Sequence, residues 1–288
     1  MRNLQNYEVK WTDDAIRWEG GLNGETAPQP TEDSDEDGCM VDPFSDPDPF
    51  ELQTFRFNLP SAFGAARDSS EITVVINGYK TTADAVWKST GLTLWKASGY
   101  LCQYQCENAH ELFSNKRVLE LGAGLGLNGI LGWKIMCSLR GSGAEVQGSV
   151  CITDGDSDAL VHLRENIQRN HTEQTTPDNI KVYCNQLLWG EQTSNTFLEQ
   201  IAQNKKYHTV LASDIIYAPS IIEPLWETVE TLLESRENGG AFVMAFARRK
   251  VPVSIDMLLE AAKAHGFECE LVKEDQDEGI WVYVFRFM

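Results

Sequence analysis

The chain has 288 residues, which suits one catalytic domain with an additional segment. Its 42% hydrophobic and 10% aromatic content is enough to bury a sizeable core. With 24 basic against 43 acidic residues the net charge is −19, and this argues against binding to nucleic acid or to an anionic membrane surface, because both require a basic footprint.

Hydrophobic runs and cysteines indicate the cellular compartment in which the protein resides. No apolar run reaches the roughly 18–20 residues of a membrane span, and the first six residues lack the apolar core of a signal peptide. The seven cysteines are an odd number without a closely spaced ladder, so they do not form the pattern of a disulfide framework. We expect a cytoplasmic protein, with the nucleus as an additional location, that acts as a monomer.

Residues 1–49 form an acidic N-terminal segment. Residues 1–50 contain 13 acidic and three basic residues, and prolines interrupt the stretch 42–49. Such a composition buries too little apolar surface to offset the loss of chain entropy, so we expect this segment to be largely disordered. It suits a solubilising tail or, alternatively, a segment that attracts basic partners.

Residues 50–100 are expected to form a hairpin followed by a helical lead-in. The stretch 51–57 alternates between polar and apolar residues, and the stretch 71–76 is rich in β-branched residues ahead of a predicted turn at Asn77-Gly78. Helical character then extends over residues 94–113. These features predict a small antiparallel hairpin before the main domain.

From residue 101 to residue 288, predicted strands alternate with predicted helices. The strands are expected at 117–121, 150–153, 181–183, 209–212, 241–246, 268–272 and 279–287, and the helices from about 127 and at 159–170, 223–233 and 255–265. Alternation of this kind predicts a parallel sheet covered by helices on both faces. Two strands in succession at the end imply an antiparallel last strand. The fold class is therefore α/β, with a doubly wound, mostly parallel seven-stranded sheet.

A glycine-rich turn follows the first strand of this domain. The turn reads Glu-x-Gly-x-Gly-x-Gly from Glu120 to Gly126, so it lies at the carboxyl edge where open α/β sheets bind ligands. The pattern Gly-x-Gly-x-x-Gly from Gly124 to Gly129 also matches the dinucleotide fingerprint, but it begins two residues after the strand has ended. A carboxylate two residues before the first glycine suits the cationic end of a ligand better than a pyrophosphate.

Asp154 ends the next strand at the same edge. A carboxylate in this position can accept hydrogen bonds from both hydroxyl groups of a ribose. It lies 34 residues after Glu120, and the polar insertion 138–148 explains this long spacing. Asp156 and Asp158 are expected to cap the helix that follows.

The glycine turn together with Asp154 resembles the S-adenosylmethionine site of the class I, seven-stranded methyltransferases. Further stretches resemble one branch, the small protein-lysine methyltransferases whose relatives modify elongation factors, chaperones and calmodulin. These stretches are Gly-Leu-Thr-Leu-Trp ending at Trp95, Leu-Leu-Trp-Gly around Trp189, and Ser-Asp-Ile-Ile-Tyr from Ser213 to Tyr217. The sequence departs from the branch at Leu188, where an aspartate is common, and in the insertion 138–148.

The resemblance implies a role for each matching position. Trp189 would flank the adenine, and Trp95 would shield the sulfonium end, with core packing as the alternative for both. The implied cofactor-binding residues are Trp95, Glu120, Gly122, Ala123, Gly124, Asp154, Trp189 and Ser213. The implied catalytic residues are Asp214 and Tyr217, which would orient the incoming amine; the alternative for Asp214 is to cap a turn before Pro219.

Two other patterns in the sequence are weaker indications of function. Cys102, Cys106 and His110 recur every four residues, but no fourth ligand lies nearby, so we expect a buried apolar stripe and no metal. The basic stretch 248–250 follows a strand at the ligand edge and is expected to be an exposed loop, or alternatively a contact for an acidic segment of a substrate.

We therefore predict a methyltransferase that uses S-adenosylmethionine and modifies a lysine of a protein substrate. A small molecule or a protein histidine is the alternative acceptor. A nicotinamide-dependent oxidoreductase and a non-catalytic binding module are the alternatives from other functional classes.

Overall fold

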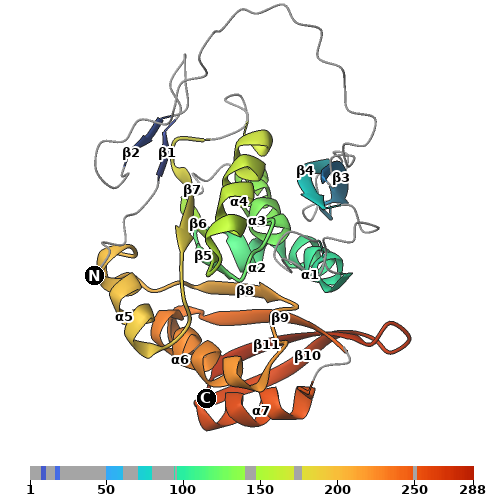
Figure 1. Cartoon of the computed structure of the whole chain (residues 1–288), viewed down its shortest axis with the longest axis vertical. Coiled ribbons are helices and arrows are strands. Elements are labelled where there is room, and N and C mark those ends of the chain that lie inside the picture. Colours follow the sequence, from blue (N-terminus) through green and yellow to red (C-terminus); the bar gives the residue numbers. More distant parts are fainter. Residues whose placement is uncertain are drawn as a thin grey trace, which may run out of the picture.

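The computed structural model describes residues 8–10, 17–19, 50–60, 71–79, 94, 96–139, 147–171, 177–248 and 252–288. These residues form a central sheet, helices on both of its faces and a separate two-stranded hairpin (Figure 1). Of the segment 1–49, predicted to be largely disordered, only residues 8–10 and 17–19 are described; residues 140–146 of the insertion 138–148 and Trp95 also lie outside the described residues.

The central sheet confirms the predicted fold class. Its strand order is β10-β11-β9-β8-β5-β6-β7-β1-β2. Strands β7, β6, β5, β8 and β9 are parallel, whereas β11 is antiparallel to both of its neighbours. The strands are β1 Glu8–Lys10, β2 Arg17–Glu19, β5 Arg117–Leu121, β6 Gly148–Asp154, β7 Ile180–Gln186, β8 Thr209–Ser213, β9 Ala241–Ala247, β10 Phe267–Asp275 and β11 Ile280–Phe287. The short strands β1 and β2, which extend the sheet beyond β7, were not expected from the sequence.

Helices form one layer on each face of the sheet, and each layer has its own apolar core. The first layer contains α1 Lys96–Glu107, α2 Ala109–Phe113, α3 Leu127–Ser138 and α4 Ser157–Asn170, and the second contains α5 Glu191–Gln200, α6 Ile222–Leu232 and α7 Ile255–Ala264. Helix α5 was not predicted, because only two of its residues, Ser194 and Phe197, are buried, so it lacks a clear apolar stripe.

Strands β3 Phe50–Asn58 and β4 Glu71–Tyr79 pair as the predicted antiparallel hairpin. The predicted turn at Asn77-Gly78 is wrong, because both residues lie inside β4 and pair with Leu52 and Glu51. The backbone of Asn77 is extended and bound by helix α4, which overrides the local preference for a turn. Strand β4 of the hairpin therefore continues past the position where the sequence predicted a turn.

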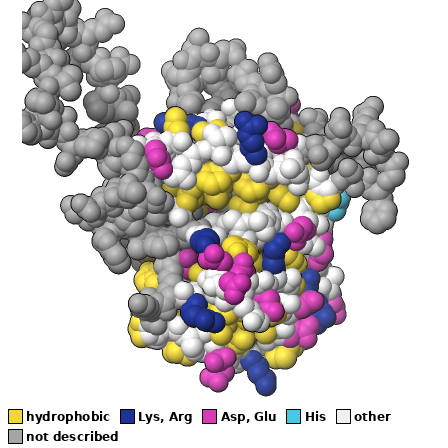
Figure 2. Space-filling model, turned by 90° about the vertical axis from the view of Figure 1, so that its right-hand side faces the viewer, with side chains coloured by type: hydrophobic (Ala, Val, Ile, Leu, Met, Phe, Trp, Pro, Cys, Tyr) yellow, Lys and Arg dark blue, Asp and Glu magenta, His cyan; other side chains and the backbone are white. Residues whose placement is uncertain are grey.

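The surface carries mixed charge on the side of the molecule that bears α1 and the hairpin. Figure 2 shows a band of hydrophobic side chains across this side, with basic and acidic side chains interspersed above and below it. Among the described helices, none combines the length and the apolar character that a bilayer crossing demands.

His265, directly after α7, connects α7 to α6 through two carboxylates. Its Nδ1 lies 2.9 Å from Glu230 and its Nε2 lies 3.1 Å from Glu223. Burial lowers the pKa of His265, but the two carboxylates outweigh this effect and the pKa is raised above 6.5. A raised histidine pKa stabilises the fold fully below pH 6.5, and this contribution is lost as the pH rises through the raised value.

We expect His265→Gln to lower the free energy of unfolding by about 1 kcal/mol or less at pH 6, and by a smaller amount at pH 9. Urea unfolding of both proteins at the two pH values measures this difference. A loss of equal size at both pH values would show that packing of the ring, and not its charge, stabilises the fold.

Candidate active site

A cavity of about 610 Å³ opens at the carboxyl ends of β5 and β8. These two strands lie where the strand order reverses, because β5 is followed along the chain by β6 on one side and β8 by β9 on the other. The cavity is lined by Leu94, Ser98, Gly122, Ala123, Gly124, Leu125, Leu127, Asn128, Asp154, Gly155, Asp156, Leu187, Leu188, Trp189, Ser213, Asp214, Ile215, Tyr217, Ile221 and Pro224. The structure thus brings together all the described residues predicted for the site except Glu120.

The glycine turn forms the floor of this cavity. Gly122, Gly124 and Gly126 have positive φ angles of 58°, 53° and 86°, a region that residues with a Cβ rarely adopt. A Cβ on Gly122 would lie 2.8 Å from Ile215 Cγ2 and 3.3 Å from Trp189 Cζ2. Gly122 is therefore required both by its backbone conformation and by the space around it.

Asp154 links this turn to the start of α4. Its Oδ2 accepts a hydrogen bond from the Gly124 N–H at 2.8 Å, and its Oδ1 accepts one from the Asp156 N–H at 2.9 Å. Burial raises the pKa of the Asp154 carboxyl, and the backbone N–H groups oppose this effect. The carboxylate lines the cavity and has acceptor sites beyond those used by these backbone groups, so it can receive a hydroxyl of a ribose. Asp156 caps α4 as predicted, since it accepts a hydrogen bond from the Asp158 N–H; Asp158, also predicted to cap, lies in the first turn and is not the cap residue.

Glu120 lies behind the glycine turn and does not line the cavity. Its side chain is only 2% exposed, and its Oε2 accepts a hydrogen bond from the Gly129 N–H, in the first turn of α3, at 2.9 Å. Burial raises the pKa of Glu120 to about 8, although the hydrogen bond from Gly129 lowers it. Glu120 therefore braces the turn against α3, and the expected direct contact with a cationic ligand finds no support in the cavity lining.

The same packing explains the glycines that matched the dinucleotide fingerprint. A Cβ on Gly129 would collide with the Glu120 carboxylate, and a Cβ on Gly126 would collide with Leu163. Both glycines permit close packing of side chains, and the oxidoreductase alternative is not needed to account for them.

Trp189 and Leu188 follow β7 and line the cavity, with Trp189 close to Gly122 of the glycine turn. Trp189 is partly buried and packs against the second apolar core, so its ring both lines the cavity and contributes to packing. Leu188 is 57% exposed, which gives the cavity an apolar side chain at the position where the resembling branch often has an aspartate. Together they offer the apolar faces that a planar base requires.

Asp214 directly follows β8, and Tyr217 lies three residues further on in an irregular segment rather than one helical turn along, as expected from the sequence. Asp214 is largely buried, and its φ of 57° is one of four positive φ angles among described non-glycine residues. Tyr217 is 56% exposed. The short helix that begins at Pro219 has Ala218 as its N-cap, so Asp214 does not cap that helix; whether Asp214 caps the turn before Pro219 stays an alternative.

Sequence reasoning missed a polar network behind Asp214. The Ser213 hydroxyl lies 2.8 Å from the Ser98 hydroxyl and accepts a hydrogen bond from Asn128 Nδ2 at 3.2 Å. Asn128 Oδ1 in turn accepts hydrogen bonds from Gln105 and from the Cys102 thiol. The network joins α1, α3 and β8, and its members lie far apart in the sequence, so only the buried polar residues within apolar stretches could have indicated it.

The structure shows where some of the residues lie that were singled out in the cysteine pattern and in the basic loop. Cys102 and Cys106 are buried in α1, whereas His110 lies exposed in α2, so the three do not share one face. Within the described residues no group of three His, Cys, Asp or Glu side chains could hold a metal ion. Arg248 stacks over the Trp281 ring at 5.0 Å, and residues 249–251 lie outside the described part of the chain.

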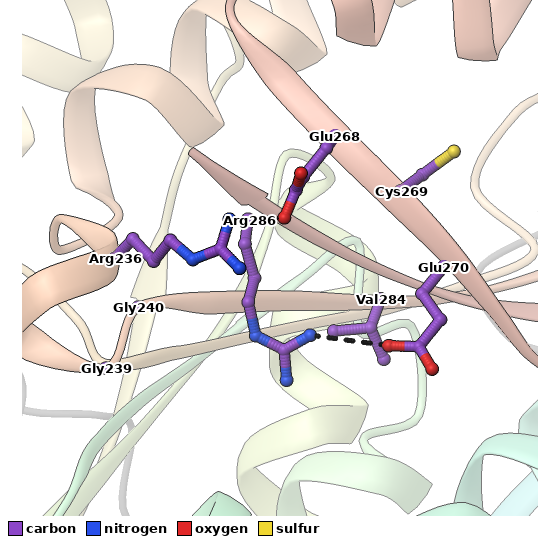
Figure 3. A pocket seen from close by; sticks show the side chains of 8 residues that line it. All are labelled: Arg236, Gly239, Gly240, Glu268, Cys269, Glu270, Val284 and Arg286. Atoms are coloured by element: carbon purple, nitrogen blue, oxygen red, sulfur yellow. Dashed lines mark hydrogen bonds and ion pairs between the residues drawn. The ribbon is translucent and has the colours of Figure 1, made fainter. Parts of the chain in front are cut away.

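A second cavity, of about 310 Å³, lies near the amino end of β9 and is crossed by charged side chains (Figure 3). Arg236 pairs with Glu268, and Arg286 lies 3.1 Å from Glu111 and 3.9 Å from Glu270. The charged side chains that line this cavity pair with one another or with Glu111, and exposed pairs of this kind contribute little to stability.

Comparison with known proteins decides the family. Residues 77–257 match the model of a family described as lysine methyltransferase. This chain belongs to that family. The chain is also similar to the protein-lysine N-methyltransferase EFM3 of Chaetomium thermophilum, with 29% identity over 62% of this chain and 48% of that relative. The chain thus spans about half the length of EFM3.

Two further relatives are matched over more of their length. The EEF1A lysine methyltransferase 3 of Xenopus tropicalis is 30% identical over 66% of this chain and 72% of the relative. The protein N-terminal and lysine N-methyltransferase EFM7 of Candida albicans is 24% identical over 83% of this chain and 87% of the relative. The resemblance drawn from the sequence is thereby confirmed, and with it S-adenosylmethionine as the cofactor of this lysine methyltransferase family member.

Proposed function

We propose that the chain transfers a methyl group from S-adenosylmethionine to an amine of a protein, in the first place the side chain of a lysine. The observation that carries this proposal is that Asp214 and Tyr217 line the same cavity as the glycine turn and Asp154. One cavity thus holds groups suited to a cofactor beside groups suited to an amine.

The cavity fits the cofactor in size and in chemistry. Its volume of about 610 Å³ lies within the range of sites for ligands of this size. Asp154 would hold the ribose, Trp189 and Leu188 would flank the base, and the Gly122–Gly124 backbone would allow close approach. When bound, S-adenosylmethionine supplies an electrophilic methyl group.

The acceptor amine must reach that methyl group without its proton. Free lysine has a pKa of about 10.4, so only about one side chain in two thousand is neutral at pH 7. The Asp214 carboxylate, largely buried in the cavity, can accept a hydrogen bond from the incoming ammonium and fix its direction. The exposed Tyr217 hydroxyl can make a second hydrogen bond at the mouth.

A protein α-amine is the second candidate acceptor. The relative EFM7, which matches 83% of this chain, is named for both N-terminal and lysine methylation. An α-amine has a pKa of about 7.7–8.0, so it loses its proton more easily than a lysine does. The hydrogen bonds proposed for Asp214 and Tyr217 would serve either amine.

The cellular compartment and the oligomeric state are also part of this proposal. Five of the described cysteines, Cys102, Cys106, Cys151, Cys184 and Cys269, are free thiols, as is usual in a reducing compartment. We propose a monomer that acts in the cytoplasm on a protein substrate. The net charge of −19 favours a basic substrate surface over nucleic acid.

The experiment supplies the purified full chain and S-adenosylmethionine with a labelled methyl group to a cell lysate. We expect the label in protein, and mass spectrometry of the labelled band should place it on a lysine side chain or on an N-terminal amine. Acetylating the lysate amines beforehand should abolish labelling. Label on histidine or only in small molecules would reject the proposed acceptor.

A further inference from the structure

Two asparagines on α4 bind the free edge of strand β4. Asn170 accepts a hydrogen bond from the Val75 N–H at 2.9 Å and donates one to the Val75 carbonyl at 2.6 Å. Asn166, one helical turn earlier, does the same for Asn77, at 2.8 and 3.2 Å. Each side-chain amide thus pairs with both backbone groups of one residue, as a neighbouring strand would.

This polar contact is buried and holds the hairpin in place. Asn166 is fully buried and Asn170 is 3% exposed, and the hairpin belongs to a sheet of its own. Val74 and Ile76 on the other side of β4 pack into the first apolar core. Without the two amides, part-buried backbone groups of β4 would lose these hydrogen bonds.

The two asparagines differ in their next contact. Asn166 Nδ2 also donates to the Leu125 carbonyl at 3.2 Å, whereas Asn170 Nδ2 donates to the Asn166 carbonyl within α4. Leu125 lies in the glycine turn between Gly124, which binds Asp154, and Gly126. One amide group of Asn166 therefore touches both the hairpin and the turn that forms the cavity floor.

We propose that Asn166 is a positioning residue that couples docking of the β3–β4 hairpin to cofactor binding. The inference rests on the cofactor site described above. Asn166 does not line the cavity, so it acts through Leu125 and the turn. By linkage, a turn that is held in place by the docked hairpin binds the cofactor more tightly, and bound cofactor secures the hairpin by the same factor.

The test compares Asn166→Ala with Asn170→Ala in the full chain. Both variants leave backbone groups of β4 unpaired, so we expect similar decreases in the melting temperature. Only Asn166→Ala also removes the contact to the turn, and we expect it to weaken S-adenosylhomocysteine binding about five- to tenfold, as for the loss of one hydrogen bond, against about twofold or less for Asn170→Ala. Calorimetry well below both melting temperatures measures the two affinities.

Turnover gives a second readout that reduced stability alone would not produce. With Asn166→Ala the KM for S-adenosylmethionine should rise while kcat at saturating cofactor stays near that of the parent. Parental affinity in Asn166→Ala would overturn the coupling, and an equal loss in both variants would overturn the specific role of Asn166 in it.

Hydrogen exchange of the parent chain tests the same coupling even if Asn166→Ala does not fold. The Val75 and Asn77 amides should exchange more slowly with S-adenosylhomocysteine present than without it. Unchanged exchange at saturating ligand would overturn the inference. Failure of S-adenosylhomocysteine to bind the parent would instead refute the cofactor site itself, so the two failures are distinguishable.

Discussion

Asp214→Asn is expected to reduce turnover by about 100-fold or more, because the acceptor amine loses the carboxylate that orients it. Affinity for S-adenosylhomocysteine should change by about twofold or less, since Asp154 and Trp189 are the groups placed to hold the cofactor. Single-turnover methylation and calorimetry on the same protein separate the two quantities.

The backbone at Asp214 decides which substitution is informative. Its φ of 57° lies in the left-handed region, which asparagine tolerates but which costs alanine about 1 kcal/mol or more. Its N–H also donates to the Ala245 carbonyl at 2.9 Å, so the turn is tied to β9. Asp214→Asn therefore removes the charge and keeps the conformation, whereas Asp214→Ala would mix both effects.

Two companion variants sharpen the result. Tyr217→Phe should cause a smaller loss of turnover than Asp214→Asn, since it removes one hydroxyl and keeps the ring. Asp256→Asn, at an exposed carboxylate in the first turn of α7, should leave turnover unchanged. Parental rates in both Asp214→Asn and Tyr217→Phe would remove the residue-level basis for an amine acceptor, and loss of cofactor binding in Asp214→Asn would move Asp214 into the cofactor site.

Gly122→Arg is expected to abolish cofactor binding. The residue has a φ of 58°, and a Cβ there already approaches Ile215 and Trp189, so a longer side chain must fill the cavity or displace its wall. Calorimetry with S-adenosylhomocysteine measures the loss. The matched control is Gly99→Arg, because Gly99 is exposed on α1 and a Cβ there meets no atom within 4 Å.

A milder variant tests the same site without filling it. Asp154→Ala should weaken binding of S-adenosylhomocysteine by about 1–3 kcal/mol, because the ribose hydroxyls lose their acceptor and the Gly124 N–H loses its partner. Circular dichroism of both variants controls for folding. Parental affinity in Gly122→Arg and Asp154→Ala together would show that the cofactor binds elsewhere.

Much of the architecture could be read from the sequence. Period-two and continuous apolar stretches predicted β5, β6, β8, β9 and β11 to within two residues, because buried strands require unbroken runs of apolar side chains. The glycine turn, Asp154 and Asp214 were placed correctly at one edge, because consecutive parallel strands all end there.

Only the tertiary structure decided the remaining features. Asn77-Gly78 prefers a turn locally, but the amide of Asn166, 89 residues away, holds this stretch in a strand. Glu120 has the charge to bind a cationic ligand, yet the packing of α3 buries its carboxylate against the Gly129 N–H. The sequence by itself determined which residue types meet at the edge of the sheet. Alternating strands and helices predict parallel strands, and the carboxyl ends of parallel strands lie at the same edge. Which of them face the cavity was decided by the packing of helices against the sheet, because burial and hydrogen-bond partners come from residues distant in the chain.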